Sequence, residues 1–275
     1  MMAKGFGAPK PAPKKEKTKA KARPKKLAVP KTAAVKQAAK PNGVTDAAGT
    51  DGVARRVDVD LGRDKSVAVM LPVLANDPDD AAVESMTRES LVEQFGHLTG
   101  AGDIVWPAGL AFSRLLAHCP SFVAEQRVVE VGSGLGAVGL TAALSGAASV
   151  VLTDYDEDVL ALATLGAQEN GVPQRVSTAP LDWSPANVAL PPGAPFDVVL
   201  GADVLYDQQN ALNIARLLPK LLREGEGAKA LIADQKQWPW RELFEGACAK
   251  VGLSVAQTPI PGPDEILLLV VSRDE

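Results

Sequence analysis

The chain has 275 residues and a formal net charge of −4, but its charges are distributed very unevenly. Up to Lys40 there are 13 Lys and Arg residues against one acid, Glu16, which gives +12; the remainder holds 16 bases and 32 acids, which gives −16. The length suits one large domain, alone or with appendages. The chain contains no run of about 20 apolar residues, so we expect nothing that spans a membrane.

The basic charge lies in a tail, residues 1–51, that is rich in Lys, Ala and Pro. Such a segment cannot bury enough apolar surface to offset its chain entropy, so we expect it to be disordered. It could be a solubilising arm, a nuclear-localisation or nucleic-acid patch around residues 14–19, or an organelle-targeting arm. We expect a cytoplasmic or nuclear monomer, with organelle targeting left open and with no nucleic-acid binding except through this tail.

The sequence offers little for metal or thiol chemistry. Its two cysteines, Cys119 and Cys248, are far apart, and its two histidines, His97 and His118, are also isolated. Neither pair has the spacing of a zinc site or of a disulfide framework. We therefore expect no metal site.

Residues 52–100 are expected to be N-terminal strands and a linking helix packed on the core. Apolar residues alternate over 57–61 and 67–71, which predicts two strands in a hairpin that turns at Gly62-Arg63-Asp64. A loop is predicted over 76–80 and a short helix over 85–95.

From residue 101 the pattern becomes regular, with strands and helices in alternation. Strands are predicted over 128–131, 149–153, 175–179, 196–200, 228–233, 253–257 and 265–272. Helices are predicted over 107–118, 137–145, 156–169, 210–222 and 241–251. This order predicts an α/β fold with a Rossmann-like, doubly wound sheet of seven strands. No helix separates the last two strands, so the sheet should be mostly parallel with an antiparallel last strand.

Ligands of such sheets bind at the carboxyl ends of the strands. The first strand after residue 101 runs into a glycine loop, Glu130-Val-Gly-Ser-Gly-Leu-Gly136. Glycines let a ligand approach the backbone, and the following helix directs free N–H groups at the same place. The loop alone is ambiguous, because Gly134 to Gly139 matches the dinucleotide pattern and Asp154 lies 20 residues after Gly134, suitable for a ribose.

Three features favour a different cofactor. Glu130 places an acid at the strand end, where it could accept a hydrogen bond from a cofactor ammonium group that a dinucleotide lacks. Asp182-Trp183 could hold an adenine, the acid through the amino group and the indole by packing on the ring. Asp203 and Tyr206 follow a later strand, where an acceptor substrate would meet the cofactor.

With these motifs in place, the sequence resembles the family-16 seven-β-strand methyltransferases, a group that contains many protein-lysine methyltransferases. The matching stretches, in the family's order, are 105–109, 128–140, 151–154, 181–183 and 199–206. The resemblance covers residues 100–237, about half of the chain. It implies that 101–275 is an S-adenosylmethionine-dependent methyltransferase domain acting on a lysine of a protein.

The resemblance also implies roles for particular residues. Trp106, Glu130, Gly132, Ser133, Gly134, Asp154, Asp182, Trp183 and Ala202 would bind the cofactor. Asp203 and Tyr206 match the Asp/Glu-x-x-Tyr motif at the acceptor and would be catalytic. One departure is visible: family members often carry Asn in the helix after Asp154, where this chain has Leu165-Gly166, and glycine inside a helix costs about 1 kcal/mol relative to alanine.

The expected reaction is a direct displacement at a sulfonium methyl group, in which the protein mainly aligns the reactants. Asp203 is then a positioning acceptor for the amine, and Tyr206 supplies a hydroxyl group or a ring face. Three alternatives stay open at this point: a small-molecule methyltransferase, a non-catalytic partner-binding module with the same fold, and a nicotinamide oxidoreductase.

Overall fold

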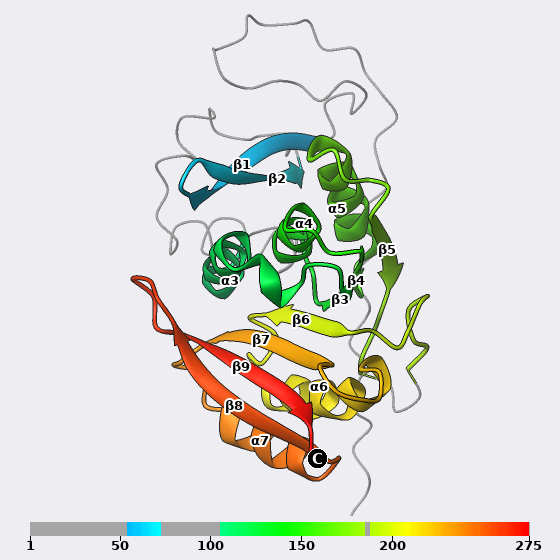
Figure 1. Ribbon diagram of the computed structural model, residues 1–275, viewed down its shortest axis with the longest axis vertical. Helices are drawn as coiled ribbons and strands as arrows, with labels where there is room; N and C mark the ends of the chain where they lie inside the picture. Colours follow the sequence, from blue (N-terminus) through cyan, green and yellow to red (C-terminus); the bar gives the residue numbers. More distant parts are fainter. Residues whose placement is uncertain (1–53, 73–104, 185–187, 275) are drawn as a thin grey trace, which may run out of the picture. The chain divides into compact units, whose positions relative to one another are not determined.

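The computed structural model describes residues 54–72, 105–184 and 188–274, and Figure 1 shows how its elements are arranged. Seven strands form one sheet in the order β5-β4-β3-β6-β7-β9-β8. They are β3 (Arg127–Val131), β4 (Ser149–Asp154), β5 (Val176–Pro180), β6 (Val198–Ala202), β7 (Lys229–Gln235), β8 (Leu253–Ile260) and β9 (Ile266–Arg273). Pairing is parallel from β5 to β7, whereas β9 is antiparallel to both β7 and β8. The predicted sheet is confirmed.

Helices cover both faces of this sheet. On one face lie α3 (Pro107–His118), α4 (Ala137–Leu144) and α5 (Glu157–Glu169), and on the other α6 (Gln208–Leu221) and α7 (Arg241–Ala249). A short 3-10 helix, η1 (Pro120–Phe122), leads from α3 towards β3. Side chains alternate along a strand, so Val128 packs in the α3–α5 core and Val129 in the α6–α7 core. Burial on both faces accounts for the nearly continuous apolar runs in the sequence.

The predicted hairpin is also confirmed. It consists of β1 (Ala54–Gly62) and β2 (Lys65–Pro72), which pair antiparallel. The turn residues Gly62, Arg63 and Asp64 all have positive φ, at 79°, 53° and 60°. Glycine takes such a conformation at no steric cost, which suits it to the start of the turn. The predicted loop over 76–80, the helix over 85–95 and the tail, residues 1–51, lie outside the described residues.

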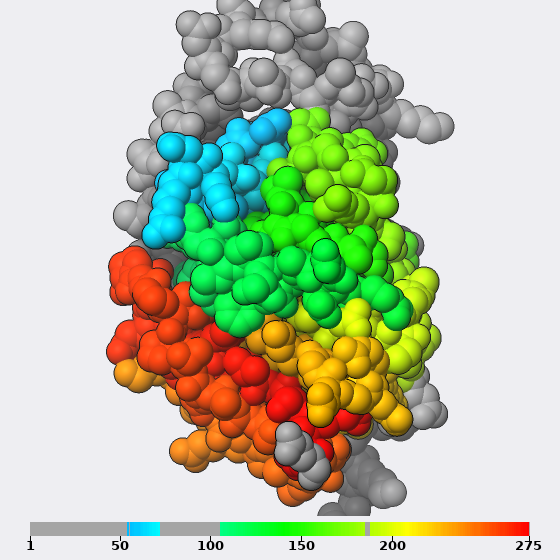
Figure 2. Space-filling view, viewed as in Figure 1, coloured from blue at the N-terminus to red at the C-terminus, as the bar shows by residue number. Residues whose placement is uncertain are grey.

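A side-chain amide attaches the hairpin to α5. Asn170 accepts a hydrogen bond from Ala68 N at 2.9 Å and donates one to Ala68 O at 2.7 Å, as a neighbouring strand would. Gly166 packs closely on α4, because a Cβ there would lie 3.0 Å from Leu140 Cδ1, whereas Ala68 O of the hairpin would be at an ordinary contact distance of 3.6 Å. The departure from the family pattern at this position therefore coincides with tight packing of α5 on α4. In Figure 2 the hairpin, in blue, lies against the green part of the molecule that contains α4 and α5.

The helix over 107–118 has the predicted bounds, but other ends differ. Helix α6 begins two residues earlier than predicted, because Asp207 accepts a hydrogen bond from Asn210 N at 2.8 Å and caps the helix. Strand β7 continues to Gln235 because its pairing with β9 continues to Ile266. Strand β8 passes through Pro259, a residue that an edge strand tolerates because one side of its ladder is open.

Candidate functional site

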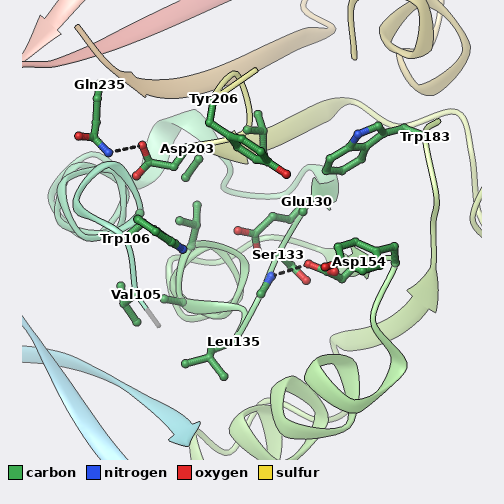
Figure 3. Close-up of a pocket in the computed structure, with 18 of the residues that line it drawn as sticks. Val105, Trp106, Glu130, Ser133, Leu135, Asp154, Trp183, Asp203, Tyr206 and Gln235 are labelled. Carbon is green, nitrogen blue, oxygen red and sulfur yellow. Dashed lines mark hydrogen bonds between the residues drawn. The ribbon is translucent and has the colours of Figure 1, made fainter. Parts of the chain in front are cut away.

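A pocket of about 270 Å³ opens at the carboxyl ends of the parallel strands (Figure 3). The loops after β3, β4 and β6 reach it, and so do the start of α3 and the end of β7. This is the position where open α/β sheets bind ligands. Its lining consists of Val105, Trp106, Gly109, Glu130, Gly132, Ser133, Gly134, Leu135, Ala137, Val138, Asp154, Tyr155, Trp183, Ala202, Asp203, Val204, Tyr206, Gln235 and Trp238.

The glycine loop after β3 forms the floor of the pocket. Gly132, Gly134 and Gly136 all have positive φ, at 62°, 50° and 79°. A Cβ on Gly132 would lie 2.8 Å from the Trp183 ring, so the loop has no room for a side chain there. Between the first two glycines, the hydroxyl of Ser133 is buried without a hydrogen-bond partner among the described residues. The loop thus presents an unsatisfied polar group in the wall of the pocket.

The Asp154 carboxylate, at the end of β4, faces the glycine loop. It accepts hydrogen bonds from Gly134 N at 3.0 Å and from Asp156 N at 3.2 Å. Burial raises the pKa of Asp154, and these main-chain donors partly offset that shift. The side chain therefore braces the loop and also presents a carboxylate to the pocket.

Glu130 lies beneath the same loop. Its Oε2 accepts a hydrogen bond from Gly139 N at 2.8 Å, in the first turn of α4. Burial raises the pKa of Glu130 to about 8, against the opposing effect of this hydrogen bond, and the charge on Asp154 adds to the rise. Gly139 has to be glycine here, because a Cβ would lie 2.7 Å from Oε2 and 2.2 Å from Leu152. A cationic ligand group would favour the ionised form of Glu130.

Asp203, which follows β6, is held between two elements. It is 8% exposed and has a φ of 53°, a left-handed conformation that is uncommon outside glycine. Its Oδ1 accepts from Gln235 Nε2 at 2.7 Å, and its Oδ2 accepts from Ala108 N at 2.9 Å. Since Ala108 lies in the first turn of α3, the carboxylate also meets the positive end of that helix dipole.

Most of the tryptophan and tyrosine side chains of the protein line this pocket. Of its four tryptophans, Trp106, Trp183 and Trp238 line the pocket, and so do both of its tyrosines, Tyr155 and Tyr206. Trp183 donates its indole N–H to Asn210 Oδ1 at 3.1 Å. The indole N–H of Trp238 is buried without a partner among the described residues, whereas Tyr206 is 48% exposed. The walls therefore combine flat apolar faces with polar edges.

Ten of the eleven predicted site residues line this pocket, and Asp182 alone lies outside it. The Asp182 side chain is exposed and accepts a hydrogen bond from Ser184 N at 2.8 Å, so it caps a turn. Nine lining residues were missed in the sequence, and three of them, Tyr155, Gln235 and Trp238, carry polar side-chain groups. The strand-end rule that pointed to Asp203 would have found Gln235 if it had also been applied to β7.

The described part of the chain contains neither a membrane-spanning helix nor a cluster of metal-binding side chains. None of its helices is long and apolar enough to cross a membrane. Within the same residues, no three His, Cys, Asp or Glu side chains gather as they would around a metal ion.

Comparison with known proteins identifies the family. Residues 88–240, more than half of the chain, match the family model described as lysine methyltransferase. Relatives include an Aspergillus fumigatus "Protein N-terminal and lysine N-methyltransferase efm7", 29% identical, with 50% of this chain and 58% of that protein covered. A rat "Electron transfer flavoprotein beta subunit lysine methyltransferase" is also 29% identical, with 59% and 60% covered.

A third relative, zebrafish "Protein N-lysine methyltransferase METTL21A", is 36% identical, with 39% of this chain and 49% of that protein covered. The chain thus spans about half to three fifths of the length of these relatives. Among solved structures, TrmN from Thermus thermophilus matches with a TM-score of 0.49 and 19% identity, over 63% of this chain and 51% of that one. On the strength of the matched family model, this chain belongs to the lysine methyltransferase family.

Proposed function

We propose that this protein transfers a methyl group from S-adenosylmethionine to a lysine side chain of another protein. The observation that carries the proposal is one pocket that combines the glycine loop and Asp154 with Asp203 and Tyr206. The lysine methyltransferase family model and the names of the relatives support a protein lysine as the acceptor. A small-molecule acceptor has no comparable support.

The residues on the floor of the pocket fit this cofactor. The unpartnered Ser133 hydroxyl would gain a partner, and Gly132 and Gly134 would let the backbone approach the ligand. Glu130 suits an ammonium group, Asp154 suits ribose hydroxyls and Trp183 suits an adenine ring. When bound, S-adenosylmethionine supplies a methyl group already activated on a cationic sulfur.

The acceptor end must handle a lysine that is mostly protonated at neutral pH, since its reference pKa is about 10.4. Trp106, Trp238 and Tyr206 line the pocket and would pack around the amine, and the resulting desolvation would favour its neutral form. Asp203 would accept a hydrogen bond from the amine and orient its lone pair. The protein's contribution is therefore alignment and desolvation, which is the main requirement of a direct displacement.

The proposal is tested with tritiated S-adenosylmethionine and a heat-treated cell extract as a mixture of acceptor proteins. We expect label in protein and, after acid hydrolysis, in methylated lysine. Asp203→Ala should abolish this transfer while the affinity for S-adenosylhomocysteine is largely kept, and the matched control Asp182→Ala should retain the transfer. Label only in small molecules, or full activity in Asp203→Ala, would contradict the proposal.

A further inference from the structure

Gln235 contacts the carboxylate of Asp203, which we propose binds the acceptor lysine. It belongs to none of the sequence motifs on which the family resemblance rests. It is the last residue of β7, it is 5% exposed and it lines the pocket. Its Nε2 donates to Asp203 Oδ1 at 2.7 Å, as the dashed line in Figure 3 shows. A buried hydrogen bond to an ionised group is of the stronger kind.

The Gln235 side chain is itself fixed in one orientation. Gln237 Nε2 donates to Gln235 Oε1 at 3.0 Å, so the oxygen of the amide faces Gln237 and the nitrogen faces Asp203. The main chain is held as well, because Gln235 pairs with Ile266 of β9 and its carbonyl accepts from Arg241 Nη1 at 3.1 Å. The donor that Asp203 meets is therefore preorganised by the sheet and by α7.

The Asp203 carboxylate accepts a hydrogen bond at each of its oxygens. The residue lies just beyond the end of β6, in a left-handed conformation, and Ala108 N donates to its Oδ2. A carboxylate offers about four lone-pair sites, so a bond to each oxygen can orient it without exhausting its capacity to accept from an amine. Gln235 supplies the bond to Oδ1.

We propose that Gln235 is a positioning residue, which holds the Asp203 carboxylate in the orientation that the acceptor lysine requires. This rests on the proposed function. Catalytic groups must be held within about 0.5 Å of their productive geometry, and a misplacement of about 1 Å can cost roughly 100-fold in rate. Gln235 acts through Asp203, so its loss should slow transfer without weakening the binding of the cofactor.

Two substitutions separate positioning from simple packing. Gln235→Leu keeps most of the volume and removes the donor at every pH. Gln235→Glu keeps the shape of the side chain but places a second carboxylate against that of Asp203. The two carboxylates can form a hydrogen bond only while they share a proton. The rate of Gln235→Glu relative to the native protein should therefore rise as the pH falls, whereas the relative rate of Gln235→Leu should stay low and flat.

Among the described residues, the charged side chains of Asp234, on β7, and Arg241, on α7, lie beside this pair. Both are kept in the native protein and in the Gln235 variants, so the proteins compared differ only at position 235. Gln257 gives matched controls, because it lies on the edge strand β8, outside the pocket, and its Nε2 donates to the Glu245 carboxylate at an exposed position. Gln257→Leu and Gln257→Glu should leave both the rate and its pH dependence unchanged.

Initial rates are measured with tritiated S-adenosylmethionine and heat-treated extract proteins from about pH 6 to about pH 8.5, a range below the lysine pKa. We expect Gln235→Leu to be at least about 10-fold slower. Calorimetric affinity for S-adenosylhomocysteine should stay within about twofold of native, well under the 1.4 kcal/mol that a tenfold change represents. Gln235→Glu, which is nearly isosteric, keeps the test valid if the leucine variant folds poorly.

Two results would overturn the inference while the proposed function stands: native rates in both Gln235 variants, or a Gln235→Glu ratio that does not change with pH. Absence of transfer by the native protein would instead refute the proposed function, and the inference would fall with it.

Discussion

The Asp154 carboxylate accepts a hydrogen bond from Gly134 N at 3.0 Å, which ties the end of β4 to the glycine loop that follows β3. The two strands are parallel neighbours, so their carboxyl ends meet although 20 residues separate the two positions. This spacing is typical of any strand-helix-strand unit, which is why it could not by itself distinguish a dinucleotide from another adenosine ligand. The acid and the aromatic side chains around the loop favour the cofactor proposed here.

The exposed carboxylate of Asp182 provides a test of which acid serves the cofactor. Because it lies outside the pocket and bonds to Ser184 N, Asp182→Ala should change the affinity for S-adenosylhomocysteine by less than about twofold, or about 0.4 kcal/mol. Isothermal titration calorimetry measures this directly. A tenfold loss would mean that Asp182 does hold the adenine, as the sequence first suggested.

A single methyl group at Gly132 should be disruptive. In Gly132→Ala the new Cβ would lie 2.8 Å from the Trp183 ring, and the φ of 62° is unfavourable for alanine. We expect a loss of stability of about 1–3 kcal/mol, measured by urea unfolding, together with weaker cofactor binding. Gly171→Ala is the matched control, because Gly171 also has a positive φ, 67°, but a Cβ there meets nothing within 4 Å. Equal effects of the two changes on cofactor affinity would rule out the contact with Trp183 as the cause.

The arrangement of the elements could be read from the sequence, but several contacts of the site could not. Alternating strands and helices predict the sheet, and a proline at the first helical position predicts the start of α3. In contrast, the bond from Gln235 to Asp203 depends on β6 and β7 becoming neighbours in a particular register. The bond from Gly139 to Glu130 depends on how α4 packs back on the end of β3. The position of Asp182 could not be read from the sequence either, since a short polar side chain can bond to its own turn, as Asp182 does with Ser184 N.

Binding of the cofactor should release protons through Glu130. Its pKa of about 8 in the folded protein means that it is mostly protonated at pH 7, and a nearby ammonium group would favour ionisation. Titration with S-adenosylhomocysteine at about pH 7, below that raised pKa, in buffers of different ionisation enthalpy should reveal the released proton. Glu130→Gln should remove most of this release. Identical proton release in the variant would place the ammonium group elsewhere.

Asp234 should make the protein less stable as the pH rises. Neither oxygen of this buried carboxyl forms a hydrogen bond of good geometry with the described residues. Burial and the charge on Asp203 raise the pKa of Asp234 to about 7, from 3.8, while Arg241 and the nearby main-chain N–H groups of Leu205 and Gln235 partly offset the shift. Between these values the folded protein holds a proton that the unfolded chain has lost, so the free energy of unfolding falls as the pH rises through this window.

In Asp234→Asn this contribution is absent. The stability of the variant relative to the native protein should therefore increase from about pH 4 to about pH 7 and level off above, by up to about 4 kcal/mol at 1.4 kcal/mol per pKa unit. Urea unfolding at several pH values gives the dependence of this stability difference on pH. Any effect of the new amide group that is the same at every pH does not alter that dependence. A relative stability independent of pH would contradict the raised pKa.

The most direct test of the account is a calorimetric titration of the protein with S-adenosylhomocysteine, run in parallel with NAD. We expect S-adenosylhomocysteine to bind with a dissociation constant on the order of 1 μM, about −8 kcal/mol, and NAD not to bind. Asp154→Ala should abolish this binding, because it removes both the pocket carboxylate and the brace on Gly134. Binding of NAD alone, or of neither ligand, would contradict the assignment of this pocket to S-adenosylmethionine.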